Sequence, residues 1–136
     1  MRKLFFGVTL SVSCLCVAIF GQDDKVARGK YLVEEVAKCQ DCHTPRTMEG
    51  VLVKSAWMKG ATLGYTPVVQ TPGWHAKTPD VTSTSSLFTR WGDDGLVKFF
   101  ETGKNPRGNA ADAPMPAYTM THDDAVAVVA FLKSLK

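Results

Sequence analysis

The five residues from Cys39 to His43 read C-Q-D-C-H, and this short motif constrains the fold more than any other feature of the chain. Two cysteines three positions apart lie on one turn of a helix, and a histidine four positions after the first lies on the same turn. Haem carries two vinyl groups, and each can take up a thiol as a thioether. We therefore expect Cys39 and Cys42 to attach a c-type haem covalently, and His43 to be the proximal iron ligand.

Two other kinds of site share parts of this motif. A redox-active C-x-x-C pair is typical of thioredoxin-like proteins, which need strands alternating with helices, and the sequence shows no strand pattern. A structural zinc ion takes four ligands, whereas the chain beyond residue 21 offers Cys39, Cys42 and three scattered histidines. Haem attachment is the interpretation that fits the spacing best.

Residues 1–21 have the pattern of an export signal, with two basic residues followed by an apolar stretch of 18 residues. We expect cleavage after Gly21, which leaves residues 22–136 as one domain in a bacterial periplasm. An uncleaved membrane anchor is the main alternative, because 18 residues are barely enough to span a bilayer. Lipid attachment at Cys14 or Cys16 is a minor alternative.

The charge of the chain excludes one class of partner. The formal net charge is +3, but Arg2 and Lys3 lie in the leader, and without them 14 basic residues face 13 acidic ones. A chain this close to neutral, with no Lys/Arg cluster, is not expected to bind nucleic acid. Its 45% hydrophobic and 21% charged residues are typical of a globular domain.

Three segments carry a helical pattern. The first covers residues 23–38, the second begins at Asp93 and ends at Gly103, and the third follows Thr121, which can cap it. The apolar residues that recur at helical spacing are Val26, Val33, Val36 and Ala37 in the first, Leu96, Phe99 and Phe100 in the second, and Ala125, Val128, Val129, Leu132 and Leu135 in the third.

The remaining segments, residues 44–90 and 104–119, are rich in Thr, Ser, Pro and Gly and show no sustained period, so we expect loops. A packed domain rarely contains so long an irregular stretch unless another component supplies its core, and a large apolar cofactor would do so. The predicted fold class is all-α, with three to five helices wrapped around one covalently bound haem.

An electron-transfer haem commonly takes a thioether sulfur as its second axial ligand. Met115 lies between Pro114 and Pro116, which prevent a helix there and hold the backbone in a defined path. It is also far enough from His43 along the chain to reach the opposite face of the haem. We expect Met115 to be the distal iron ligand, and Met120 is the nearest alternative.

The other candidate ligands are given structural roles. Met48 and Met58 are expected to fill the core, as methionine commonly does in small proteins. His122 falls in the first turn of the last predicted helix, where a surface histidine is common, and His75 lies in a loop. Neither histidine is expected to bind iron.

Five motifs resemble those of class I c-type cytochromes, over residues 28–136. They are R-G-K-Y-L, C-Q-D-C-H-T-P, T-P-D-V-T, R-W-G-D-D-G-L-V-K-F-F-E-T-G-K and P-M-P-A-Y-T-M-T-H-D-D-A-V-A-V-V-A-F-L-K-S-L. The middle motifs are most similar to small cytochrome c domains that serve as electron-accepting subunits of bacterial dehydrogenases. The chain differs from that group at Lys77, where asparagine is usual, and at residues 85–88, where a Gly-rich turn is usual. These differences leave the partner open.

The resemblance also implies roles for individual residues. Gly29 and Phe131 match positions where the first and last helices cross closely. Thr82 and Trp91 match positions near the haem edge and the propionates. The residues that match the thioether cysteines and the two axial ligands are Cys39, Cys42, His43 and Met115.

Together these patterns predict a periplasmic mono-haem electron carrier, or the electron-accepting subunit of a respiratory or dehydrogenase chain, that is not itself an enzyme. Its expected partners are redox proteins: a dehydrogenase, another cytochrome or a terminal oxidase. The alternatives are a haem peroxidase with an open iron position and a gas or redox sensor whose Met115 is displaced. The sequence shows no acid–base pair that would serve a vacant distal site.

Overall fold

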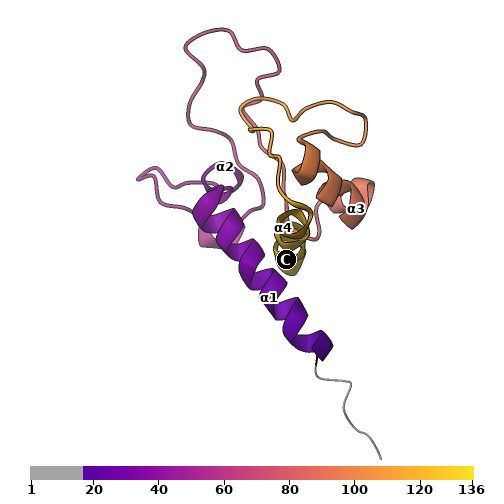
Figure 1. Cartoon of the computed structure of the whole chain (residues 1–136). Helices are drawn as coiled ribbons and strands as arrows, with labels where there is room; N and C mark the ends of the chain where they lie inside the picture. Colours follow the sequence, from indigo (N-terminus) through magenta and orange to yellow (C-terminus); the bar gives the residue numbers. More distant parts are fainter. Residues whose placement is uncertain (1–16) are drawn as a thin grey trace, which may run out of the picture.

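The computed structural model describes residues 17–136, so most of the expected leader, residues 1–21, lies outside the described residues (Figure 1). No strand forms within the described part of the chain, where isolated bridges alone join extended residues. The predicted all-α class is therefore confirmed. The helices are α1 (Val17–Tyr31), the π-helix Leu32–Val36, α2 (Gln40–His43), the 3-10 helix Lys54–Ala56, α3 (Ser86–Thr102) and α4 (His122–Ser134).

Helices α1 and α4 cross closely and form the frame of the molecule (Figure 1). At the crossing, a β-carbon added to Gly29 would overlap the backbone carbonyl of Ala127 and lie 2.8 Å from Cβ of Phe131. Only glycine allows this approach, because any side chain would push the two helices apart. The crossing that the resemblance implied for Gly29 and Phe131 is confirmed.

The first helix changes its hydrogen-bond pattern near its end. The N–H of Ala37 donates to the carbonyl of Leu32 at 2.8 Å, which is the five-residue step of a π-helix. The wider turn rotates the following side chains, so Val33 is buried while Val36 is 58% exposed. The prediction that Val36 faces the core is therefore wrong. Lys38 then adopts a left-handed conformation, with φ of 52°, and the chain turns into α2.

Helix α3 consists of two pieces joined at Gly92, whose φ of 64° and ψ of −179° are not helical. The second piece, residues 93–102, is the helix predicted to begin at Asp93, and its face of Leu96, Phe99 and Phe100 is buried. The predicted loop extended to residue 90, and its last part, residues 86–90, is helical instead. Gly103 ends the helix with a φ of 67°, as expected.

Helix α4 begins as predicted. The N–H of Asp124 donates to Oγ1 of Thr121 at 3.3 Å, and the apolar stripe that follows is buried against α1 and α3. Met58 is fully buried, as expected for a core residue. Met48 is fully exposed, so its predicted core position is wrong. The bridge between Arg46 and Leu52 closes a small turn, and Met48 lies within it.

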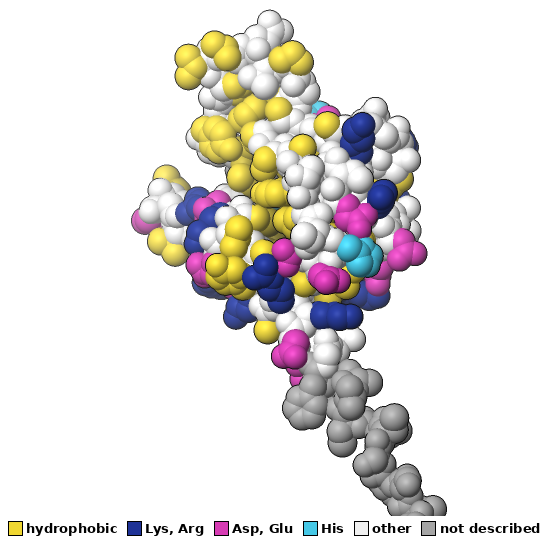
Figure 2. Space-filling model, viewed as in Figure 1, with side chains coloured by type: hydrophobic (Ala, Val, Ile, Leu, Met, Phe, Trp, Pro, Cys, Tyr) yellow, Lys and Arg dark blue, Asp and Glu magenta, His cyan; other side chains and the backbone are white. Residues whose placement is uncertain are grey.

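A larger loop, residues 62–77, is closed by a bridge between Thr62 and Lys77. Its tip exposes Tyr65, Val68 and Val69, and Figure 2 shows hydrophobic side chains gathered over this loop at the top of the molecule. Within residues 17–136, no helix combines the length and the hydropathy needed to cross a membrane.

Candidate functional site

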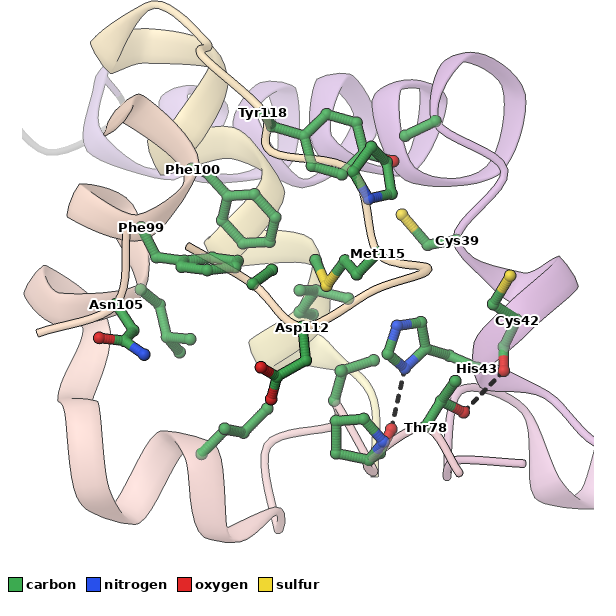
Figure 3. A pocket seen from close by; sticks show the side chains of 18 of the residues that line it. Cys39, Cys42, His43, Thr78, Phe99, Phe100, Asn105, Asp112, Met115 and Tyr118 are labelled. Carbon is green, nitrogen blue, oxygen red and sulfur yellow. Dashed lines mark hydrogen bonds between the residues drawn. The ribbon is translucent and has the colours of Figure 1, made fainter. Parts of the chain in front are cut away.

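A cavity of about 470 Å³ lies among α2, α3, α4 and the loops between them (Figure 3). This volume is within the range of about 300–1,000 Å³ that is typical of cofactor and small-molecule sites. Most of the wall is apolar. The aliphatic and aromatic side chains that form it include Val81, Leu87, Phe88, Trp91, Leu96, Phe99, Phe100, Tyr118 and Leu132.

One wall of the cavity is the turn that carries the C-x-x-C-H motif. The N–H of His43 donates to the carbonyl of Cys39 at 2.9 Å, so both cysteines and the histidine lie on the same helical turn, as expected. Cys39 and Cys42 are free thiols that line the cavity. Burial raises the pKa of Cys39 to about 11, so this thiol stays protonated in the folded apoprotein at neutral pH.

The His43 side chain is buried and points into the cavity (Figure 3). Its Nδ1 lies 2.9 Å from the carbonyl oxygen of Pro79, and a carbonyl can only accept. The neutral ring therefore carries its hydrogen on Nδ1, which leaves the lone pair on Nε2 free to bind a metal. Burial lowers the pKa of His43 and outweighs the opposite effect of the Pro79 hydrogen bond, so the ring is neutral at neutral pH.

Met115 reaches the same cavity from a distant part of the sequence. Figure 3 shows its thioether in the space that also receives the His43 ring. The Met115 N–H donates to the carbonyl of Asp112 at 3.1 Å, which closes a turn over residues 112–115. Met120, the alternative ligand, is not part of the cavity wall, and its N–H donates to the carbonyl of Phe100 at 2.9 Å.

The remaining candidates occupy different places. Trp91 lines the cavity and packs on Phe99, with ring centroids 5.4 Å apart. Thr82 is fully buried but does not line the cavity, and its Oγ1 lies 3.2 Å from Oγ1 of Thr84. The resemblance placed both near the haem edge, and only Trp91 contacts the cavity.

The two histidines that were not expected to bind iron also differ in position. His75 lines the cavity rim, where its Nε2 lies 3.6 Å from a carboxylate oxygen of Asp112. His122 is on the surface, with Nδ1 2.7 Å from Glu101. That hydrogen bond, helped by Lys98, holds the pKa of Glu101 below its usual value.

Three residues at the site were not predicted from the sequence: Gly60, Thr78 and Pro79. The N–H of Gly60 donates to the carbonyl of His43 at 2.8 Å, and Thr78 Oγ1 donates to the carbonyl of Cys42 at 2.7 Å. The Thr-Pro-Asp sequence at 78–80 was a recognisable signal. Nothing local in it indicates that the Pro79 carbonyl faces a histidine 36 residues away.

The sequence matches the family model described as Cytochrome c over residues 26–136. The chain belongs to the cytochrome c family. The predicted resemblance is therefore confirmed, and a cytochrome c domain implies a covalently bound haem c.

Three relatives show which cytochromes c the chain resembles. It is 34% identical to the fructose dehydrogenase cytochrome subunit of Gluconobacter japonicus, over 83% of this chain and 22% of that protein. It is 34% identical to the cytochrome c subunit of the quinone-type alcohol dehydrogenase of Gluconobacter oxydans, over 83% of this chain and 24% of the other. It is 31% identical to the gluconate 2-dehydrogenase cytochrome c subunit of Pantoea cypripedii, over 84% of this chain and 27% of that protein.

This cytochrome c domain spans about a quarter of the length of those relatives. Each of the three names describes a cytochrome subunit of a dehydrogenase. This agrees with the prediction of an electron-transfer protein that is not itself an enzyme.

The residues around the cavity fit a haem c. Two free thiols on one turn suit the two vinyl groups, and a buried neutral imidazole and a thioether suit the iron. The apolar wall suits the porphyrin ring. Lys77 and Arg90 also line the cavity, and their positive charges would suit the two propionate carboxylates. Tyr118 lies beside Cys39, and burial raises its pKa to about 12, so its hydroxyl stays neutral.

Proposed function

We propose that this protein is a periplasmic mono-haem electron carrier or the electron-accepting subunit of a dehydrogenase chain. The observation that carries the proposal is one cavity that receives Cys39, Cys42, His43 and Met115 together. The sequence contains a single C-x-x-C-H motif, which supports one haem in this chain. The leader pattern of residues 1–21, as a cleaved signal or a retained anchor, supports a periplasmic location.

When bound, haem c supplies an iron that alternates between the ferric and ferrous states. In this proposal, Cys39 and Cys42 would hold the macrocycle through thioethers, and His43 and Met115 would bind the iron. The apolar wall excludes water, and a thioether ligand favours the ferrous state, so both effects raise the reduction potential. No group of the protein has to gain or lose a bond during electron transfer.

The relatives support a dehydrogenase as the electron donor, because their names describe cytochrome subunits of such enzymes. Another cytochrome or a terminal oxidase would then be the acceptor. The chain alone does not bind the dehydrogenase substrate in this proposal. Its specificity is for protein partners that approach the cavity rim in brief, small contacts.

The proposal is tested by the absorption spectrum of the purified holoprotein. A weak far-red band from sulfur-to-iron charge transfer in the ferric form is the expected result, and Met115→Ala is expected to abolish it and lower the reduction potential. Met120→Ala is the matched control. It removes a methionine five residues away that does not line the cavity, and it should retain the band.

A five-coordinate, high-spin ferric spectrum in the wild type would contradict the carrier and favour a peroxidase or a sensor with a displaceable ligand. If the far-red band remains in Met115→Ala and disappears in Met120→Ala, the distal ligand is Met120.

A further inference from the structure

Residues 78–79 contact the C-x-x-C-H turn at two points. The Pro79 carbonyl accepts a hydrogen bond from Nδ1 of His43 at 2.9 Å, and Thr78 Oγ1 donates to the carbonyl of Cys42 at 2.7 Å. We propose that Thr78 is a positioning residue for His43, because its hydroxyl holds the Pro79 carbonyl against the imidazole. This inference rests on the proposed role of His43 as the proximal iron ligand.

The Thr78 hydroxyl uses both its donor and its acceptor capacity. A hydroxyl has one hydrogen to donate, and Cys42 O at 2.7 Å is a nearer acceptor than Ala61 O at 3.2 Å. Thr78 Oγ1 also accepts from the N–H of Ala61 at 2.9 Å. One side-chain atom therefore ties together three parts of the chain: the motif turn, residue 61 and the segment that carries Pro79.

The backbone of Pro79 has no N–H, so it cannot donate a hydrogen bond that would fix the position of its own carbonyl. The N–H of Thr78 donates to the carbonyl of Ala61 at 2.9 Å, and this bond fixes the backbone without determining its distance from the motif turn. The Thr78 hydroxyl is the adjacent group that bonds directly to that turn. Its loss would free the Pro79 carbonyl to move away from Nδ1.

Gly60 packs closely against the same segment and also bonds to the motif turn. A β-carbon on Gly60 would lie 2.6 Å from the carbonyl oxygen of Thr78 and 2.9 Å from the carbonyl carbon of Pro79. Gly60 also has a φ of 86°, a conformation that other residues rarely adopt. Its N–H donates to the His43 carbonyl at 2.8 Å. The backbone of the 78–79 segment therefore lies directly against Gly60, and the Thr78 hydroxyl is the side-chain bond that connects this segment to the motif turn.

The Pro79 hydrogen bond matters for the iron because the partner of Nδ1–H tunes the basicity of the other ring nitrogen. A shorter hydrogen bond from Nδ1 makes Nε2 a stronger electron-pair donor to iron, which stabilises the ferric state. A longer hydrogen bond makes Nε2 a weaker electron-pair donor, which favours the ferrous state. Removing the Thr78 hydroxyl should therefore raise the reduction potential and expose the Nδ1 hydrogen to exchange with solvent.

The test compares Thr78→Val, which keeps the shape of the side chain and removes the hydroxyl, with Thr78→Ser, which keeps the hydroxyl. In the reduced holoprotein, NMR follows the exchange of the His43 Nδ1 hydrogen. We expect exchange about tenfold faster in Thr78→Val, the size associated with one lost hydrogen bond. The midpoint potential should rise, and Thr78→Ser should restore both wild-type values.

Thr102→Val is the matched control. The Thr102 hydroxyl also donates to a backbone carbonyl, that of Lys98 at 2.7 Å, and accepts from a backbone N–H, that of Lys104, but Thr102 does not line the cavity. Thr102→Val should leave the exchange rate of the His43 Nδ1 hydrogen and the midpoint potential unchanged. If Thr78→Val does not yield holoprotein, Thr78→Ala carries the same measurement.

The inference about Thr78 would be overturned if Thr78→Val or Thr78→Ala retains its haem and also keeps the wild-type rate of Nδ1 hydrogen exchange and the wild-type midpoint potential. Failure of the proposed function gives a different result. In that case the wild-type protein itself would show no haem-linked histidine Nδ1 hydrogen, and the variants would not be needed to see it.

Discussion

Arg28 and Asp124 join the surfaces of α1 and α4 beside their crossing, with Nε and Oδ1 2.9 Å apart. The hydrogen bond from Arg28 holds the pKa of Asp124 below its ordinary value of 3.8. A carboxyl whose pKa is lower in the folded state stabilises the fold above the unfolded value, and this stability is lost as the pH falls through the folded value. Arg28→Gln should therefore be less stable than wild type at neutral pH, and the difference should vanish well below pH 3.8.

Urea unfolding at a series of pH values measures this effect. Because both side chains are substantially exposed, the loss at neutral pH should be small and should shrink as salt is added. Lys25→Gln is the control: it removes one positive charge from the same helix, and Lys25 makes no ion pair within residues 17–136. An equal loss in both variants, or a loss that persists in acid, would contradict the role given to the ion pair.

Single residues were predictable where their chemistry is local. The C-x-x-C-H spacing is sufficient to place Cys39, Cys42 and His43 on one turn, because a helical turn has a fixed geometry. Met58 and Met48 show the opposite case. The two side chains have the same intrinsic preference for burial, and one is in the core while the other is fully exposed, because the path of the surrounding loop decides.

At the scale of helices, the α1–α4 crossing depends on the absence of a side chain at Gly29. A β-carbon there meets backbone atoms of Ala127, which cannot rotate away as a side chain can. Gly29→Ala should therefore lower the free energy of unfolding by about 3 kcal/mol, at the upper end of the usual cost of overpacking. Chemical denaturation of the holoprotein measures the change.

Gly64→Ala is the matched control for that substitution. No atom lies within 4 Å of a β-carbon built at Gly64, and its backbone is not in the left-handed region. Its stability should be within about 0.5 kcal/mol of wild type, as for most surface substitutions. If Gly29→Ala is equally well tolerated, the close approach of α1 and α4 is not needed for stability.

A helix was predictable from the sequence where its apolar residues recur at 3.6 residues per turn without interruption. In α4, the Thr121 cap and the apolar stripe agree with a single uninterrupted helix. The π-helix at Leu32–Val36 and the break at Gly92 change the period or the direction of the chain within an element. A helical period of 3.6 residues per turn does not place the side chains beyond such points. For this reason the sequence pattern groups Val36 with the buried Val33 and assigns residues 86–90 to a loop.

At the scale of the whole molecule, the fold encloses a cavity that its own side chains do not fill. Without haem, the largely apolar wall of this cavity would be in contact with water, which costs free energy in proportion to its apolar area. A small domain is stable by only about 5–15 kcal/mol in total. The double variant Cys39→Ser with Cys42→Ser should therefore lose covalent haem, and the apoprotein should lose most of its helical circular dichroism.

Wild-type protein produced without haem is the control, and it should be as unfolded as the double variant. The two single variants, Cys39→Ser and Cys42→Ser, should each retain one thioether and keep the fold. A double variant that stays helical without haem would show that the loops support themselves, contrary to the interpretation of the irregular residues 44–90 as a covering for the cofactor.

The bridge between Thr62 and Lys77 has a consequence for how this scaffold tolerates change. The Leu63 N–H also donates to the Ala76 carbonyl at 2.7 Å, so the two ends of the loop are tied to each other directly. The entropy of closing such a loop grows only slowly with its length. Insertions or deletions between residues 66 and 73 can therefore remodel the exposed apolar tip while Thr78 and Pro79 stay against His43. The length and sequence of this tip can therefore vary at little cost to the packing around the C-x-x-C-H turn.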